Sequence, residues 1–74
     1  EGRVEIKVVE VPLGMIGRPA GILNVPGEIM AITLTRRNQS MIPTAETIME
    51  KGDLIHFAVL LNSVEKFKSM MMIR

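Results

Sequence analysis

The segment that most constrains the fold is residues 54–61, because it is apolar at both alternating positions of an extended chain. Side chains of a strand point in turn to its two faces. One face here carries Leu54, Ala58 and Leu60, and the other carries Ile55, Phe57, Val59 and Leu61. This composition is typical of a strand that is covered on both faces. We therefore expect residues 54–61 to form the central strand of a sheet.

A second strand is expected to begin at Glu28, directly after the turn signal Pro26-Gly27. Its apolar residues recur with the period of two that is typical of a strand. One face carries Met30, Ile32 and Leu34, and the other carries Ala31, Thr33 and Thr35. The first of these faces is the more apolar, so we expect it to face the core.

The polar residues between these two strands predict turns. Arg37-Asn38-Gln39 is the expected tip of a hairpin, because asparagine tolerates left-handed backbone angles. Residues 40–42 would return as a short strand that Pro43 ends. The sequence Glu50-Lys51-Gly52-Asp53 predicts a tight polar turn that leads into the central strand.

Near the amino end, Val4, Ile6 and Val8 alternate with Glu5 and Lys7 until Pro12 stops the run. The alternation predicts a strand whose apolar face lies on the core and whose charged face lies in water.

Residues 14–23 contain glycine and proline, which are poor helix formers. Ile16, Ala20 and Leu23 nevertheless recur at spacings of four and three, which predicts a short helix.

A second helix is expected at the carboxyl end. Asn62 or Ser63 can cap it, and with Asn62 as the cap, Glu65 completes a capping-box-like arrangement. An apolar stripe then follows at helical spacing, made of Val64, Phe67, Met71 and Met70.

The predicted order of elements is therefore β-α-β-β-β-α, an α+β fold with a small antiparallel sheet and two helices. Residues 3–72 form one domain, and residues 1–2 and 73–74 are expected to be ragged ends. The chain begins at Glu1 without an initiator methionine, so we expect the functional polypeptide to be longer.

Composition argues against several partners. The 74 residues carry nine basic and eight acidic side chains, so no basic surface for nucleic acid is expected. Phe57 and Phe67 are the only aromatic residues, which is too few for a base-stacking surface. No apolar run approaches the roughly 20 residues that span a bilayer, so direct membrane insertion is not expected.

No constellation of residues predicts an enzyme or a metal site. The chain has no cysteine, and His56 is its only histidine, which we interpret as a residue packed within the central strand. Ser40, Ser63 and Ser69 lack the motif of an activated nucleophile. The carboxylates Glu46, Glu50 and Asp53 cluster near a turn, where solvated charge is the usual explanation.

Three further patterns have a structural and a functional interpretation. Gly14, Gly17 and Gly21 do not have the spacing of a phosphate loop and are interpreted as packing residues. Arg36-Arg37 could hold an anion or serve as soluble surface. The cluster Met70-Met71-Met72, with Met41 and Met49, is interpreted as core and interface packing rather than a soft-metal site.

The order of several motifs resembles one known family. A strand ending in proline is followed by Ile16-Gly17-Arg18-Pro19 at the start of the short helix, and then by EIMAITLTRR. After the polar tip comes MIPTAETIMEKGDLIHF. In this order and at this spacing, the motifs resemble the TrkA carboxy-terminal domain, also called the RCK carboxy-terminal domain. The resemblance covers residues 3–72.

This resemblance implies a β-α-β-β-β-α fold that pairs as a homodimer. It also implies attachment to a larger protein that regulates potassium or other cation transport through a membrane-embedded transporter or channel subunit. The domain would then be cytoplasmic and tethered at the inner membrane. The nucleotide-binding domain that adjoins it in such proteins is not part of this chain.

The resemblance also implies a ligand cleft. In some members the domain binds cyclic diadenylate at the dimer interface, between residues that follow the first helix and the segment around the proline after the hairpin. Val25 and Pro43 match this cleft by position, and Ile42 and Arg36 complete the candidate ligand-binding set. Members that bind this dinucleotide carry an Ile-Arg pair where this chain reads Val25-Pro26-Gly27. The identity of any nucleotide effector therefore stays open, and no cofactor is expected.

A small domain buries a modest share of its surface, so this apolar chain would gain from a partner. Val9, Val11 and Ile29 are the surplus apolar residues that we expect to pack against a second copy. Two functions follow: a regulatory domain that senses a ligand and dimerises in a cation transport system, or a purely structural association domain without a ligand.

Overall fold

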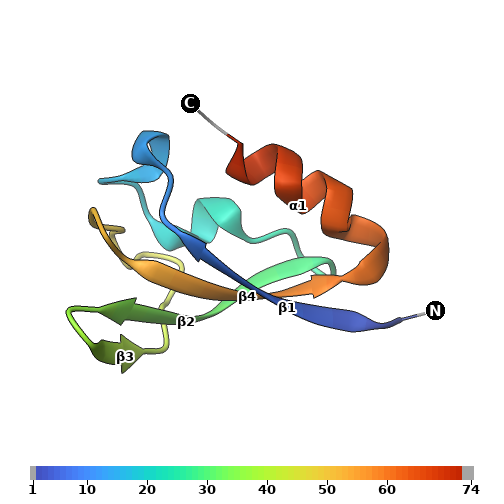
Figure 1. The fold of residues 1–74 in the computed structure, drawn as a ribbon, viewed down its shortest axis with the longest axis horizontal. Coiled ribbons are helices and arrows are strands. Elements are labelled where there is room, and N and C mark those ends of the chain that lie inside the picture. Colours follow the sequence, from blue (N-terminus) through green and yellow to red (C-terminus); the bar gives the residue numbers. More distant parts are fainter. Residues whose placement is uncertain (1, 73–74) are drawn as a thin grey trace.

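The computed structural model describes residues 2–72, which form an antiparallel sheet with helical segments on one side (Figure 1). The strands are β1 (Val4–Glu10), β2 (Ile29–Arg36), β3 (Gln39–Met41) and β4 (Leu54–Leu60). The 3-10 helices are η1 (Leu13–Met15), η2 (Ala20–Leu23) and η3 (Leu61–Ser63), and α1 spans Val64–Met71. The strand order in the sheet is β1-β4-β2-β3. Residue 1 and residues 73–74, which belong to the expected ragged ends, lie outside the described residues.

The prediction that residues 54–61 form the central strand is confirmed. β4 pairs with β1 along one side and with β2 along the other. Its side chains Ile55, Phe57 and Val59 are buried under the helical segments. The opposite side chains of β4 are only partly buried, and Leu54 is exposed. A single copy of the chain therefore covers one of the two apolar faces of its central strand.

The orientation predicted for β1 is wrong. Val4, Ile6 and Val8 are 56%, 58% and 55% exposed, whereas Glu5 and Lys7 lie half-buried on the helix side. The cause lies at the end of the strand, where Val9 packs on the core and the next odd-numbered residue, Val11, is buried. Because a strand alternates strictly, burying these valines turns the even-numbered side chains to the uncovered face.

The face predicted for β2 is also wrong in its first half. A bulge at Ile32 shifts the register between Ala31 and Thr33. Ahead of the bulge, Ile29 and Ala31 are buried and Met30 is exposed, and beyond it Leu34 is fully buried. One extra residue in a strand reverses the faces that follow it, and simple alternation cannot anticipate this.

The helix predicted over residues 14–23 is wrong. The segment forms the two short 3-10 helices η1 and η2, each preceded by a proline with extended backbone angles. Gly17 between them has a φ of 85°, which an α-helix cannot contain. The structure therefore has one α-helix within the described residues rather than two.

The helix α1 is confirmed, and its apolar stripe covers the sheet. Phe67 is buried and meets Phe57 of β4 edge-on, with ring centroids 5.0 Å apart. Val64, Met70 and Met71 pack around the core. Ser63 is the N-cap residue, but its hydroxyl donates to Glu28 at 3.0 Å, so no capping box forms.

The predicted turns are confirmed. Arg37 and Asn38 adopt positive φ angles of 49° and 65° at the hairpin tip, as a two-residue hairpin turn requires. The return strand β3 begins at Gln39, one residue earlier than expected. Gly52 has a φ of 88° in the turn before β4.

The residues expected to pack against a second copy are wrong. Val11 and Ile29 are buried in the core of a single copy, and Val9 packs against that core. The apolar surface that a partner could use lies on the other side of the sheet. We call this surface the open face, and it consists of Val4, Ile6, Val8, Met30, Leu54, His56, Ala58 and Leu60.

Candidate functional site

The segment η2 lies against the connection between β3 and β4. The amide of Ala20 donates to the carbonyl of Thr47 at 2.7 Å, and the amide of Gly21 donates to the carbonyl of Ala45 at 2.9 Å. Pro19 also forms an isolated bridge with Ile48. The two stretches that the family resemblance assigns to a ligand cleft, one near η2 and one after Pro43, therefore adjoin each other.

This junction depends on a glycine at position 21. A Cβ atom there would lie 2.8 Å from the Cβ atom of Ala45 and 2.9 Å from its carbonyl oxygen. These distances are shorter than van der Waals contact, so the junction closes only with hydrogen at this position. The interpretation of Gly21 as a packing residue agrees with this contact. Its neighbour Ala45 could not be named from the sequence, because the two residues are far apart in the chain.

Ile42 and Pro43 stand at the start of the connection. Ile42 is 82% exposed, which is unusual for so large an apolar side chain, and Pro43 is half-buried. An exposed apolar side chain is available to contact a ligand or a partner.

Val25 has a structural role in a tight loop. Its amide donates to the carbonyl of Ile29 at 2.8 Å, and its carbonyl accepts the amides of Glu28 and Ile29 at 2.9 Å. Its side chain is half-buried and packs on the core. Any ligand contact made by Val25 would therefore involve its side chain and not its backbone.

Arg36 is engaged within the chain on every side of its guanidinium. Nε donates to Oδ1 of Asp53 at 2.9 Å, and Nη2 donates to Oδ2 at 2.7 Å. Nη2 also donates to the carbonyl of Ile48 at 2.9 Å, and Nη1 lies 3.0 Å from Oε2 of Glu50. Arg36 therefore fastens the β2–β3 hairpin to the β3–β4 connection, and an anionic ligand would have to compete with two carboxylates for it.

This ion pair shifts the ionisation of both partners. The hydrogen bonds from Arg36 lower the pKa of Asp53, and the amide of Glu50 lowers it further, while burial acts in the opposite direction. The same bonds raise the pKa of Arg36. Both groups are charged at neutral pH, as a bidentate pair requires.

His56 lies on the open face between Val8 of β1 and Thr33 of β2. Its Nδ1 atom is buried and has no hydrogen-bond partner. No group of three or more metal-binding side chains occurs within residues 2–72. The residue sits in the central strand as predicted.

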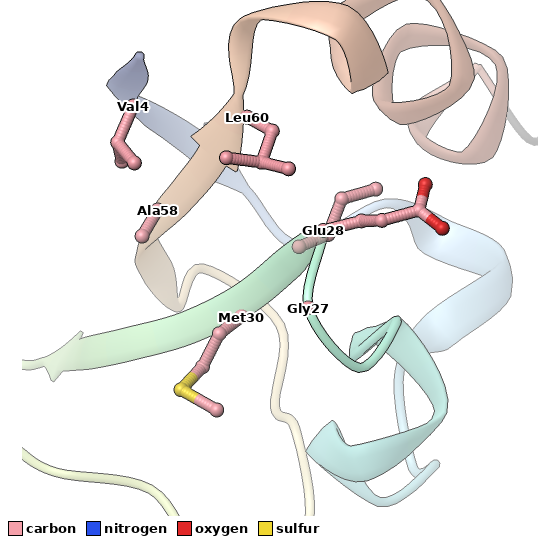
Figure 2. A pocket seen from close by; sticks show the side chains of 7 residues that line it. Val4, Gly27, Glu28, Met30, Ala58 and Leu60 are labelled. Atoms are coloured by element: carbon pink, nitrogen blue, oxygen red, sulfur yellow. The ribbon is translucent and has the colours of Figure 1, made fainter. Parts of the chain in front are cut away.

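A pocket of about 230 Å³ opens at the end of the open face where β2 begins (Figure 2). Apolar side chains of β1, β2 and β4 line it, among them Val4, Met30 and Leu60. The carboxylate of Glu28 points away from these side chains in Figure 2 and is held by Ser63 and Lys66, the latter at 2.6 Å. The pocket contains none of the predicted ligand-binding residues. Glu28 is the ionisable residue of its lining, and its carboxylate is engaged by Ser63 and Lys66.

Comparisons with known proteins identify the fold. No protein-family model and no curated protein match the chain. Among solved structures, the C domain of the potassium transport protein KtrA, a regulator of conductance of K⁺ (RCK), in complex with cyclic diadenosine monophosphate, superimposes with a TM-score of 0.75. The match has 20% sequence identity and covers 92% of this chain and 84% of that one. The chain has the fold of an RCK C domain.

A second structure supports this assignment. An RCK domain solved with cda matches with a TM-score of 0.70 and 16% identity, over 89% of this chain and 96% of that one. At 16% and 20% identity, the two matches establish the shared fold. No helix within residues 2–72 is long and apolar enough to cross a bilayer.

Proposed function

We propose that this RCK C-like chain is a regulatory domain of a potassium or other cation transport system, which senses a ligand and works as a homodimer. The observation that carries the proposal is the match of its fold, over nearly the whole chain, to RCK C domains. The KtrA domain among them was solved in complex with cyclic diadenosine monophosphate. The domain would act in the cytoplasm, joined to a membrane-embedded transporter or channel subunit through its parent protein.

The junction of η2 with the β3–β4 connection is the proposed ligand site. At the start of the β3–β4 connection, Ile42 offers an exposed apolar side chain and Pro43 offers a rigid, half-buried one. Val25 would contribute the remaining apolar contact. Arg36 contributes by holding the connection in place through Asp53 rather than by direct contact, because its donors are already engaged. A flat apolar ligand such as a nucleobase suits these contacts better than an isolated phosphate.

Regulation would follow from a difference in affinity. A ligand shifts the relative orientation of two copies only if it binds one orientation more tightly than the other. A tenfold preference is worth about 1.4 kcal/mol, which is enough to change the populations of two similar states. The attached domains would transmit the change of orientation to the pore.

Thermal-shift and calorimetric titrations test the proposal, with cyclic diadenylate, other nucleotides, K⁺ and divalent cations as probes. We expect one of them to raise the melting temperature of the 74-residue chain. Ile42→Asp should abolish that response, because it places a charge where an apolar contact is needed. Leu13→Asp is the matched control, since Leu13 is a similarly exposed apolar residue in η1.

The alternative is a structural association domain without a ligand. All three guanidinium nitrogens of Arg36 are engaged within the chain, which favours a structural role for this residue. No response to any probe would establish this alternative in place of ligand sensing. A response that Ile42→Asp leaves intact would move the ligand site away from the junction.

A further inference from the structure

The pocket described above is a hollow at one end of the open face. Its apolar lining comes from three neighbouring strands and includes Val4 of β1, Ala58 and Leu60 of β4, and Met30 of β2 (Figure 2). The volume of about 230 Å³ is below the roughly 300–1,000 Å³ of pockets that enclose a whole small ligand. A pocket of this size and lining suits one large apolar side chain of a partner.

The apolar surface continues from the pocket along the sheet. Ile6 and Val8 follow Val4 along β1, and each of the three is more than half exposed. Leu54 is 41% exposed in the neighbouring strand β4. Contiguous exposed apolar side chains indicate an interaction site, whereas single ones need no explanation. A small molecule held in the pocket alone would leave most of this surface in water, so an extended partner fits it better.

A carboxylate lies at each end of this surface. Glu28, at the pocket, accepts a hydrogen bond from Lys66 at 2.6 Å and points away from the pocket lining. Glu10 lies opposite Leu54 at the other end, is exposed, and forms no ion pair with any residue in the range 2–72. The open face contains no lysine or arginine. A partner that complements the surface therefore brings a basic side chain to Glu10.

We propose that the open face binds an amphipathic helix of a partner protein. One large apolar side chain of that helix enters the pocket, and a lysine or arginine of the helix pairs with Glu10. An apolar sheet face is commonly covered by helices, and α1 already covers the other face of this sheet. The inference goes beyond the proposed function and does not rest on ligand sensing, because the pocket contains none of the predicted ligand-binding residues.

The length of the surface sets the spacing of residues in the partner helix. Val4 and Glu10 begin and end β1, and at about 3.3 Å per residue they lie about 20 Å apart. A helix aligned with the strand rises about 1.5 Å per residue, so about eleven residues span about 17 Å, and a lysine side chain covers the rest. The helix should carry its large anchor at position i, apolar residues at i+4 and i+7 over Ile6 and Val8, and its basic residue at i+11.

Charge weighs against two other occupants of the open face. A second copy stacked through the same face would add another Glu10 and no lysine or arginine. An anionic membrane surface attracts basic side chains, which the open face lacks. A helix with one basic residue covers the apolar surface and also pairs with the carboxylate.

A designed peptide tests the proposal on the 74-residue chain. The probe is an alanine-rich helix of about 16 residues with phenylalanine at i, leucine at i+4 and i+7, and lysine at i+11, and its fluorescence anisotropy measures binding. We expect saturable binding with a Kd of about 100 μM or below. A probe of the same composition with these four residues scattered around the helix should bind about tenfold more weakly, and equal binding of the two probes would overturn the proposal.

Filling the pocket tests the anchor. Ala58 lines the pocket on the open face, so Ala58→Leu occupies it from the outer side of the sheet. This variant should bind the phenylalanine probe about tenfold more weakly and should bind a probe with alanine at position i as the parent chain does. Ala58→Ser keeps the pocket open and is the matched control. Equal weakening of both probes by Ala58→Leu would overturn the anchor pocket.

Charge reversal tests the other end of the helix. Glu10→Lys should weaken binding of the lysine probe by about threefold to tenfold, because an attraction becomes a repulsion at an exposed site. A probe with glutamate at i+11 should restore binding to this variant. Glu46→Lys is the charge-matched control on an exposed loop and should have no effect. Equal weakening of the lysine and glutamate probes by Glu10→Lys would overturn the pairing with Glu10.

Two further outcomes separate this inference from the proposed function. Dissociation of the homodimer by Met30→Lys would show that a second copy occupies the open face, and it would overturn the helix. Absence of saturable peptide binding up to about 1 mM would overturn it as well, and a nucleotide response of the same chain would still support ligand sensing. Peptide binding without any nucleotide response would support the helix site and overturn ligand sensing.

Discussion

Arg36 and Asp53, 17 residues apart, form a two-point ion pair that closes the hairpin onto the turn before β4. The side chain of Asp53 is 1% exposed and that of Arg36 is 17% exposed. Oδ2 of Asp53 also accepts the amide of Glu50 at 2.8 Å. One carboxylate therefore orders both the β2 end of the hairpin and the Glu50–Asp53 turn.

Replacement of this carboxylate by an amide should destabilise the fold. Asp53→Asn removes the charge that the partly buried guanidinium requires, so we expect the free energy of unfolding to fall by about 2–3 kcal/mol. Urea denaturation measures the change. Glu46→Gln is a matched control on an exposed loop and should change stability by less than about 0.5 kcal/mol. Equal stability of the two variants would contradict a structural role for the ion pair.

The same pair predicts how stability depends on pH. Arg36 lowers the pKa of Asp53 in the folded chain, so the unfolded chain takes up a proton at this group first as the pH falls. The contribution is complete above the unfolded pKa of about 4, and it declines as the pH drops from there through the folded pKa. Denaturation curves measured from about pH 2 to about pH 7 should show this loss of stability. Asp53→Asn should remove most of the slope, and Glu28, whose pKa Lys66 also lowers, should account for part of what remains.

A methyl group at position 21 should open the candidate ligand site. Gly21→Ala places a Cβ atom 2.8 Å from that of Ala45 and 2.9 Å from its carbonyl oxygen, so the backbone must move apart. We expect a loss of about 1–3 kcal/mol in stability, as for other overpacked sites. The pair G21A/A45G removes the contact between the two Cβ atoms but keeps the contact with the carbonyl, and should recover only part of the loss. Thermal denaturation checks both variants, and full recovery would show that the side chains alone set the distance.

Truncation of Phe67 should detach α1 from the sheet. Phe67 is buried and packs edge-on against Phe57 at 5.0 Å, so Phe67→Ala removes the main apolar anchor of the helix. Such truncations cost about 3–5 kcal/mol, which is a large share of the stability of a domain of this size. Far-UV circular dichroism and denaturation should show a loss of helix and of stability. Phe67→Leu keeps most of the volume and should cost less.

The central strand could be predicted because its signal is local. Residues 54–61 are apolar at both parities, which is typical of a strand inside a sheet, and β4 lies between β1 and β2. The hairpin tip at Asn38 and the turn at Gly52 were also predictable, since both need backbone angles that few residues adopt. In each case the local residue types are enough to indicate the strand or the turn.

The buried faces of β1 and β2 could not be predicted by the same means. In β1 the alternation of Val4, Ile6 and Val8 is real, but the burial of Val11 beyond the strand decides which face is inside. In β2 the bulge at Ile32 depends on pairing with β4 and leaves no mark in the sequence. Both features are set by contacts between segments that are distant in the chain.

The same limit applies to the candidate ligand site. The family resemblance indicated Val25 and Pro43, and Ile42 and Arg36 completed the candidate set. The binding roles of all four residues remain predictions. The partner of Arg36 could not be identified from the sequence, because Asp53 lies in a separate turn that only the fold brings to it. The contact of Gly21 with Ala45 was hidden for the same reason.

The unequal length of the two outermost strands limits how far the sheet can extend. The outer edge of β3 offers only three residues, whereas that of β1 offers seven. The short margin at β3 gives an incoming strand little to bond, so this side of the sheet is protected against extension by another chain.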